Sequence, residues 1–327
     1  ALNFNGGTNA NAITGTGTLG VSGAFVNNAT INQASLTLAD EANFTSYEDI
    51  TLSNSADITN SGSFTLNGAN LDIGTANIIN NGTMSMDGSS YLTAGNLTNN
   101  AGHYLTIRNP NSLNLSGTFT NGGDVFLQGT LPEGFAITRT GNGKINVASG
   151  GTNSLTINNG VDLGNHSIVT YGSTSLYVNA DNFGNTITGG GLTYLRSSTF
   201  TGDIQLEDGY LYFDSDDIVN LEGANISNSG MGGIFLNAGT TLNVSADSHM
   251  RGFITNPGII NLSGEFGGGS GESVIYGNGV VNIPSGASAY IRNNVANTVN
   301  VAQNATLNVD NPSIMGVTFG NMNINGT

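Results

Sequence analysis

Apolar residues alternate with polar ones in short triplets along the whole chain, and most triplets are followed closely by Asn or Gly. Alternation with a period of two is typical of a strand that buries one face. We therefore expect many very short strands, each ended by a turn. Clear examples are Phe64-Thr65-Leu66, Met84-Ser85-Met86, Leu105-Thr106-Ile107, Val125-Phe126-Leu127 and Ile145-Asn146-Val147.

The triplets recur with a regular period. Those starting at positions 64, 84, 105, 125 and 145 are separated by 20, 21, 20 and 20 residues, and a second series starts at 71, 92 and 113. Turn signals such as Thr59-Asn60-Ser61-Gly62 keep the same spacing, and Asn and Gly tolerate the left-handed backbone of tight turns. A period near 20 residues with two or three strands predicts the coil of a parallel β-solenoid.

The predicted fold is all-β: a single-stranded parallel β-helix of roughly 16 coils with about 20 residues each. Coils that stack at about 4.8 Å pair each strand with its equivalents above and below, and Asn at equivalent turns can form amide ladders. We expect one continuous solenoid over residues 1–327, more regular in 50–160 and looser in 183–280. The alternative, a two-layer sandwich, usually has longer strands and no 20-residue period.

Composition excludes several classes of function. The formal net charge is −16 and Lys144 is the single lysine, so the chain has too few cations to neutralise nucleic-acid phosphates. The sequence has no Cys and therefore no disulfide, thiolate metal site or Cys nucleophile. No apolar run approaches the roughly 18 residues of a membrane span. We expect neither a nucleic-acid partner nor insertion into a membrane.

The turn-and-strand pattern resembles that of filamentous-haemagglutinin-type and autotransporter passenger domains. The resemblance is clearest in Thr59–Gly68, Ile79–Gly88 and Thr120–Gly129, where Asn and Gly precede an alternating strand that ends in Gly. Residues 187–193, 198–202 and 206–211 are similar to an autotransporter-associated strand repeat.

This resemblance implies a right-handed β-helix that is secreted and serves adhesion or surface structure, and it transfers no catalytic residue. We therefore expect a non-enzymatic protein, extracellular or at the cell surface, that acts as a stalk, filament subunit or adhesin. We expect no cofactor, apart from Ca²⁺ that acidic residues could hold.

One acidic cluster could carry chemistry. Carboxylates suit Ca²⁺, although the same cluster can equally be a solvated acidic edge. Two adjacent members, Asp216 and Asp217, also resemble the paired aspartates of a polygalacturonase, but the Asn-Thr-Asp, Gly-His-Gly and Arg-x-Lys companions are missing. A polysaccharide lyase or hydrolase is therefore a lesser alternative. The cluster consists of Glu207, Asp208, Asp214, Asp216 and Asp217.

Aromatic residues lie beside this cluster. Tyr210 and Tyr212 could form a sugar-binding surface with the nearby carboxylates, which gives the alternative function of a glycan-binding adhesin. Alternate aromatic residues could instead fill the core. The histidines, His103, His166 and His249, are far apart in sequence and beside polar residues, so we expect them in exposed turns.

Both ends of the chain already read as strands, and no polar or helical cap is visible. A bare strand edge recruits other strands. The chain is therefore either a piece of a longer rod or a subunit that associates end to end. In the second case the contact residues are Leu2, Phe4, Met322 and Ile324.

Overall fold

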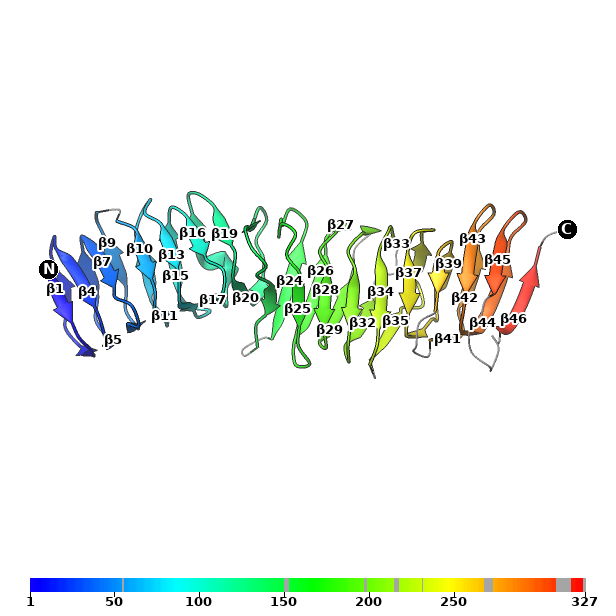
Figure 1. Ribbon diagram of the computed structural model, residues 1–327, viewed down its shortest axis with the longest axis horizontal. Coiled ribbons are helices and arrows are strands. Elements are labelled where there is room, and N and C mark those ends of the chain that lie inside the picture. The colour runs from blue at the N-terminus through cyan, green and yellow to red at the C-terminus, as the bar shows by residue number, and fades with distance from the viewer. Residues whose placement is uncertain are drawn as a thin grey trace. The chain divides into compact units, whose positions relative to one another are not determined.

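A computed structural model describes residues 1–54, 56–149, 153–196, 199–214, 218–230, 232–267, 273–309 and 319–325. It divides into two compact units, residues 1–155 with 160–166 and residues 156–159 with 167–327. Figure 1 shows the stacked short strands of each unit. Both units consist of short parallel strands stacked coil on coil, about 15 turns of β-solenoid in all, against the roughly 16 predicted. The prediction of an all-β parallel solenoid is confirmed, whereas one continuous solenoid over 1–327 stays a prediction.

Each regular coil of the first unit contributes one strand to each of three faces. One face consists of β2 (Gly7–Asn9), β5 (Ala24–Asn27), β8 (Asn43–Ser46), β11 (Ser63–Leu66), β14 (Thr83–Met86), β17 (Tyr104–Ile107), β20 (Asp124–Leu127) and β23 (Ile145–Val147). The second consists of β3 (Ile13–Thr14), β6 (Ile31–Gln33), β9 (Ile50–Leu52), β12 (Asn70–Asp72), β15 (Tyr91–Ala94) and β18 (Leu113–Leu115).

The third face of this unit is divided between two sheets. They are β1 (Leu2–Phe4), β4 (Thr18–Val21) and β7 (Ser35–Leu38), and then β10 (Ile58–Asn60), β13 (Ile78–Asn80), β16 (Leu97–Asn99), β19 (Phe119–Asn121) and β22 (Thr138–Arg139). The short β21 (Gly129–Thr130) and the 3-10 turn η1 (Pro110–Ser112) complete the unit, and β24 (Ser154–Asn158) spans the boundary between the units. Among the described residues, η1 is the only helical element.

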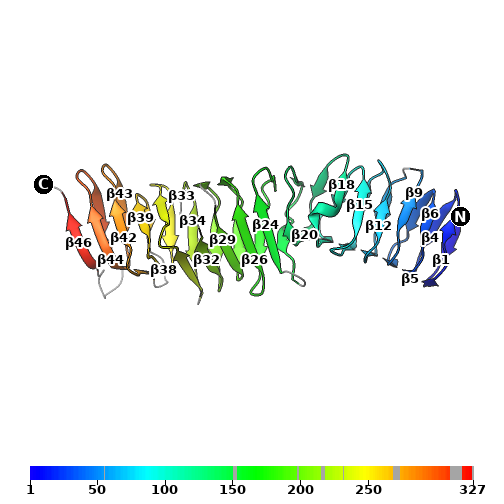
Figure 2. The same ribbon diagram turned by 180° about the vertical axis from the view of Figure 1, so that it is seen from behind.

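The second unit repeats the plan. One face consists of β25 (Ile168–Thr170), β28 (Ile187–Gly189), β31 (Ile204–Leu206), β34 (Asn225–Asn228), β37 (His249–Arg251), β40 (Glu265–Phe266), β43 (Ser288–Ile291) and β45 (Thr306–Val309). Another consists of β26 (Ser175–Asn179), β29 (Leu192–Leu195), β32 (Tyr210–Phe213), β35 (Gly233–Leu236), β38 (Phe253–Thr255) and β41 (Val274–Tyr276), of which Figure 2 labels β26, β29, β32 and β38.

The remaining face of the second unit consists of β27 (Asn182–Phe183), β30 (Thr199–Phe200), β33 (Ile218–Leu221), β36 (Thr241–Val244), β39 (Ile259–Leu262) and β42 (Val280–Ile283). The long strand β44 (Asn294–Val301) pairs with β41 through its first residues and with β42 through its last, and so belongs to both faces. The final strand, β46 (Phe319–Ile324), pairs with β44.

Inward side chains stack along each unit in the register that the sequence spacing predicts. Phe64 is paired with Phe44 on one side and Met84 on the other, and all three are fully buried. The rings of Phe25, Phe44 and Phe64 stack at 5.7 and 5.4 Å between centroids. Burial of one such side chain contributes about 1.5–3 kcal/mol, so these stacks hold the coils together.

The first unit also contains a buried amide ladder, here called the inner ladder, formed by Asn60, Asn80, Asn99 and Asn121. Each Nδ2 donates to the next Oδ1, at 2.8, 2.7 and 2.9 Å in turn. All four side chains are fully buried, which confirms the expectation of stacked asparagine amides.

The inner ladder ends at a histidine. Asn121 Nδ2 lies 3.0 Å from His166 Nε2, and His166 Nδ1 lies 2.6 Å from the carbonyl oxygen of Leu163. These partners require a neutral imidazole that accepts at Nε2 and donates from Nδ1. Burial lowers the pKa of His166, which favours that neutral form. The expectation of an exposed turn histidine is therefore wrong for His166, which is 1% exposed because it terminates the ladder.

A second ladder, here called the outer ladder, lies on the solvent side of the second unit. Consecutive amides are 2.7–3.1 Å apart, and each Nδ2 donates to the Oδ1 of the preceding coil. Its four central members are half-buried. The ladder consists of Asn220, Asn243, Asn261, Asn282, Asn300 and Asn323.

Candidate functional site

Aromatic side chains gather on the outer side of one face in the second unit. Strand alternation places Leu211 and Phe213 in the core and leaves Tyr210 and Tyr212 facing outward. Register then aligns Tyr212 with Tyr194 on one neighbouring strand and with Phe235 on the other. Phe213 therefore fills the core, whereas Tyr210 and Tyr212 lie together on the surface.

Four of these rings form a continuous row, here called the aromatic stripe: Tyr177, Tyr194, Tyr212 and Phe235. Consecutive centroids are 4.8, 4.9 and 5.0 Å apart, and the interplanar angles are 9°, 13° and 16°. The spacing between parallel strands is close to the distance at which aromatic rings stack, so the stripe follows from the register. Because each inner ring is stacked between two others, mainly ring edges face the solvent.

Tyr210 adds a more accessible ring beside the stripe. It is 38% exposed, and its centroid lies 6.5 Å from Tyr212 and 6.0 Å from Phe235, with tilted planes. The residue paired with Tyr210 on the next strand is Gly233. A Cβ at that position would lie 2.8 Å from Cε2 of Phe235, so the absence of a side chain there lets the Phe235 ring lie next to Tyr210.

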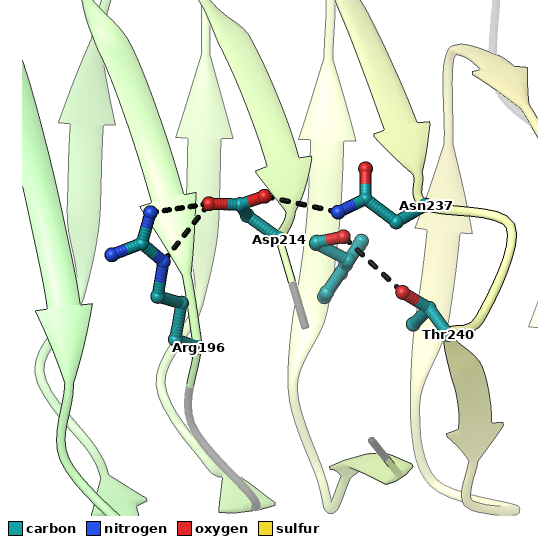
Figure 3. Close-up of polar contacts among 5 residues, drawn as sticks. Arg196, Asp214, Asn237 and Thr240 are labelled. Atoms are coloured by element: carbon teal, nitrogen blue, oxygen red, sulfur yellow. Dashed lines mark hydrogen bonds and ion pairs between the residues drawn. The ribbon is translucent and has the colours of Figure 1, made fainter. Parts of the chain in front are cut away.

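A row of polar side chains borders the stripe, just beyond the ends of the same strands (Figure 3). Arg196 donates from Nε and Nη2 to Asp214 Oδ2 at 2.9 and 2.5 Å. Asn237 Nδ2 donates to the other oxygen, Oδ1, at 2.9 Å. The Arg196 guanidinium also lies 5.8 Å from the centroid of the Tyr177 ring, which is within the range of a cation–π contact.

Hydrogen bonds shift the pKa of one group on this surface, and burial shifts the pKa of another. The Arg196 guanidinium, with help from Asn237, holds the pKa of Asp214 below its ordinary value. Burial, with Tyr177 and Tyr212 on either side, raises the pKa of Tyr194. Near neutral pH the surface therefore presents an ion pair beside the protonated phenol of Tyr194, which can donate and accept hydrogen bonds. Aromatic rings next to planar polar groups are the usual components of a sugar-binding surface.

The predicted acidic cluster is only partly described. Glu207 and Asp208 are exposed, and Asp214 is held by Arg196 and Asn237. Asp216 and Asp217 lie outside the described residues. Within the described ranges, no group of three or more His, Asp or Glu side chains is arranged to hold a metal ion.

The predicted end residues lie on the first and last strands that the structure describes. Leu2 and Phe4 belong to β1, which is at the edge of its sheet. Leu2 is 45% exposed, and the half-buried Phe4 ring stacks on Phe25 at 4.4 Å. Met322 and Ile324 belong to β46 and are 38% and 66% exposed.

Some members of the surface were not predicted from the sequence. These are Tyr177, Phe235 and Arg196, each on a different coil. The four members of the aromatic stripe are separated by 17, 18 and 23 residues in the sequence. That irregular spacing hides the alignment from a search for a fixed period. One signal could have identified them as surface residues: each aromatic residue alternates with buried apolar residues in its strand and therefore faces outward.

In the part of the chain that the structure describes, we find no helix with the length and apolar character needed to cross a membrane. Comparisons with known proteins found no matching family model, no matching curated protein and no matching solved structure.

Proposed function

We propose that the chain is a non-enzymatic extracellular β-solenoid, similar in kind to filamentous-haemagglutinin-type and autotransporter passenger domains, that acts as a stalk, filament subunit or adhesin. The observation that carries this proposal is the stacking of the described coils in parallel register, with the apolar stacks and both amide ladders running along the stacking direction. Such coils satisfy their backbone through neighbouring coils, which suits a stiff structural element.

Fractionation of the cells that make the protein tests its location. We expect the protein in the medium or on the cell surface, where protease added to intact cells can reach it. Recovery only from the cytosol would contradict an extracellular role.

We further propose end-to-end self-association through β1 and β46, whose apolar side chains are exposed at the edges of their sheets. Small-angle scattering over a concentration series should show growth, and Ile324→Lys should reduce it. Ile218→Lys is the matched control, because Ile218 is also exposed, at 56%, but lies on the inner strand β33. Scattering that does not change with concentration would contradict the association.

A second function, glycan binding by an adhesin, is favoured by the outward-facing rings of Tyr210 and the aromatic stripe beside Arg196 and Asp214. On a glycan array we expect binding that Tyr210→Ala weakens at least tenfold. Tyr91→Ala is the control, since Tyr91 is 54% exposed and belongs to the other unit. Equal loss in both variants, or binding unchanged by Tyr210→Ala, would remove this function while leaving the structural one intact.

The absence of enzymatic activity is part of the proposal and is tested separately. Acidic polysaccharides incubated with the protein should release neither unsaturated products nor new reducing ends. Cleavage by the natural sequence that is lost in Asp216→Asn and Asp217→Asn would establish the alternative of a lyase or hydrolase.

A further inference from the structure

The second face of the first unit ends abruptly at β18. The six strands of that sheet run from β3 to β18, and Figure 2 labels β6, β9, β12, β15 and β18 in a row. The next coil would ordinarily supply a strand from residues 131–137. Pro132 lies in that segment and has no N–H to donate to a neighbouring strand.

Residues 134–137 do not pair with β18 but bond, in parallel, to residues 160–162 of the following stretch of chain. Gly134 N–H donates to the Gly160 carbonyl at 3.1 Å, and Ile137 N–H donates to the Asp162 carbonyl at 2.9 Å. Asp162 N–H donates back to the Phe135 carbonyl at 2.9 Å. The segment therefore joins the following stretch of chain and leaves β18 as an edge.

A cleft of about 430 Å³ lies between this edge and the displaced segment. On one side it is lined by Leu113, Leu115 and Gly117, and on the other by Pro132 and Phe135. A cleft of this size lies within the usual range of ligand pockets. Its apolar lining is the uncovered end of the core.

Two core stacks stop at this cleft. Ile50, Leu71 and Leu92 are fully buried members of one stack, and the next member, Leu113, is only half-buried. In the second stack, Leu115 follows the buried Ala94 and is likewise half-buried. Both leucines lack the apolar neighbour that one more strand would supply.

The backbone at this edge can also accept a strand. Ser116 N–H donates to the Ala94 carbonyl, so the alternation of a strand directs the N–H and C=O of Leu115, and the C=O of Leu113, away from β15. The N–H of Leu113 is already donated to Pro110. One donor and two acceptors therefore point toward the cleft, in the arrangement that strand addition uses.

Charge favours one kind of partner. Glu133 is exposed at the cleft, and the whole chain carries a formal charge of −16. A basic segment is attracted by this field, whereas a second copy of the same acidic chain is repelled.

We propose that the β18 edge binds an extended, basic peptide segment of another protein as an added parallel strand. Two apolar residues of the segment stack on Leu113 and Leu115. The residue between them donates its N–H to the Leu113 carbonyl and accepts a hydrogen bond from the Leu115 N–H.

Fluorescence anisotropy with labelled synthetic peptides tests this proposal on the full chain. The probe is KKTVTVTK, and its matched control, KKTTVVTK, has the same composition and charge but adjacent valines. We expect saturable binding of the probe at least tenfold tighter than that of the control. A probe with an N-methyl group on the threonine between the valines should lose at least tenfold, because it cannot donate to Leu113.

Surface variants locate the site without disturbing the core. Ala136→Tyr, at an exposed position in the cleft, should weaken the probe at least tenfold, whereas Ala101→Tyr, at an exposed position outside it, should not. Glu133→Lys should weaken it about fivefold, the effect of one exposed ion pair. Hydrogen exchange should slow at the Leu115 amide when the probe is added.

Equal affinity for the two peptides would overturn the proposal, and so would binding that ignores both Ala136→Tyr and N-methylation. Self-association that Ala136→Tyr abolishes, without peptide binding, would identify a second copy as the occupant and also refute it. Capture of a small apolar dye in the cleft, again without peptide binding, would refute it in favour of a small-molecule pocket.

Discussion

Replacement of Asn99 by Ala removes the middle of the inner ladder and tests whether buried amides hold the first unit together. Asn99 Oδ1 accepts from Asn80 at 2.7 Å, and Asn99 Nδ2 donates to Asn121 at 2.9 Å. Asn80 keeps a second acceptor, the Tyr104 carbonyl at 2.9 Å. Asn121 Oδ1 loses the donor that the ladder supplies, inside a fully buried side chain.

The expected loss of stability follows from these contacts. The two lost ladder hydrogen bonds cost about 0.5–1.5 kcal/mol each, and one buried acceptor left without a donor costs about 1–3 kcal/mol. The longer contacts from Asn99 Nδ2 to the carbonyl oxygens of His103 and Asp124, at 3.4 and 3.3 Å, are lost as well. A water molecule that enters the vacated space would offset part of this cost. We therefore expect Asn99→Ala to lower the free energy of unfolding of the first unit by about 2–4 kcal/mol. Asn99→Asp should lower the free energy of unfolding further, because it places a carboxylate oxygen next to the side-chain oxygen Oδ1 of Asn121 in a buried position that water does not reach.

The matched control is Asn261→Ala in the outer ladder. Asn261 also has an amide neighbour on each side, at 2.7 and 3.1 Å, but it is half-buried, so water can replace its partners. We expect a loss below about 1 kcal/mol. Urea unfolding followed by far-UV circular dichroism gives the midpoints, and hydrogen exchange in β13, β16 and β19 gives the local opening free energy. Equal losses in the two variants would refute desolvation as the source of the inner ladder's strength.

Three further outcomes follow from single contacts. Burial lowers the pKa of His166, so the first unit should lose stability as the pH falls below 6.5 toward the pKa of the folded state. The loss is at most about 1.4 kcal/mol per pH unit. In urea titrations at several pH values, His166→Gln should remove this dependence on pH. Gly143→Ala should cost about 2–4 kcal/mol in the same assay, because its Cβ would overlap the Gly123 carbonyl oxygen, whereas Gly88→Ala, with open space around it, should be neutral or slightly stabilising. Arg196→Gln should raise the pKa of Asp214 toward 3.8, as measured by a carbon-13 titration. In the natural sequence, the Arg196–Asp214 contact adds stability above pH 3.8 that is lost as the pH falls through the pKa of the folded state, and the variant should lack this contribution.

The sequence predicts the coil register well because the core enforces it. Phe64, Met84, Leu105 and Val125 were predicted as equivalent positions, and the structure pairs each with the next. A slip of one residue would turn every apolar side chain of a strand outward, so the apolar spacing leaves little freedom. The predicted number of coils, roughly 16, is close to the about 15 turns observed.

The role of each asparagine was harder to predict. Asn243 lies between Leu242 and Val244, so alternation places it outward, as observed. Asn80 lies two residues after Ile78 and shares its inward parity. The position of this amide in the buried layer is hard to predict from one coil, because its closest partners, the side chains of Asn60 and Asn99 and the carbonyl oxygen of Tyr104, belong to other coils. His166 was misplaced for the same reason: its partner, Asn121, lies 45 residues earlier.

The candidate surface shows the same limit. The parity of Tyr210 and Tyr212 follows from Leu211 and Phe213 between and after them. The alignment with Phe235 depends on a coil of 23 residues, which is longer than the two before it, of 17 and 18 residues. Coil length varies through insertions in turns, which alternation does not constrain, and so the members of the stripe could not be predicted together.

The two surfaces proposed for binding differ in what the fold leaves available. In the regular coils, each strand of a sheet pairs on both edges, and inward side chains are covered from both sides. Such coils can offer a partner only their outward side chains, which is how the aromatic stripe would act. At β18 the pairing stops, so the backbone and the core layer are both available. Restoring a strand at 131–137, for example through Pro132→Thr with Gly134→Thr, should therefore suppress peptide binding at β18 and leave glycan binding in the other unit unchanged.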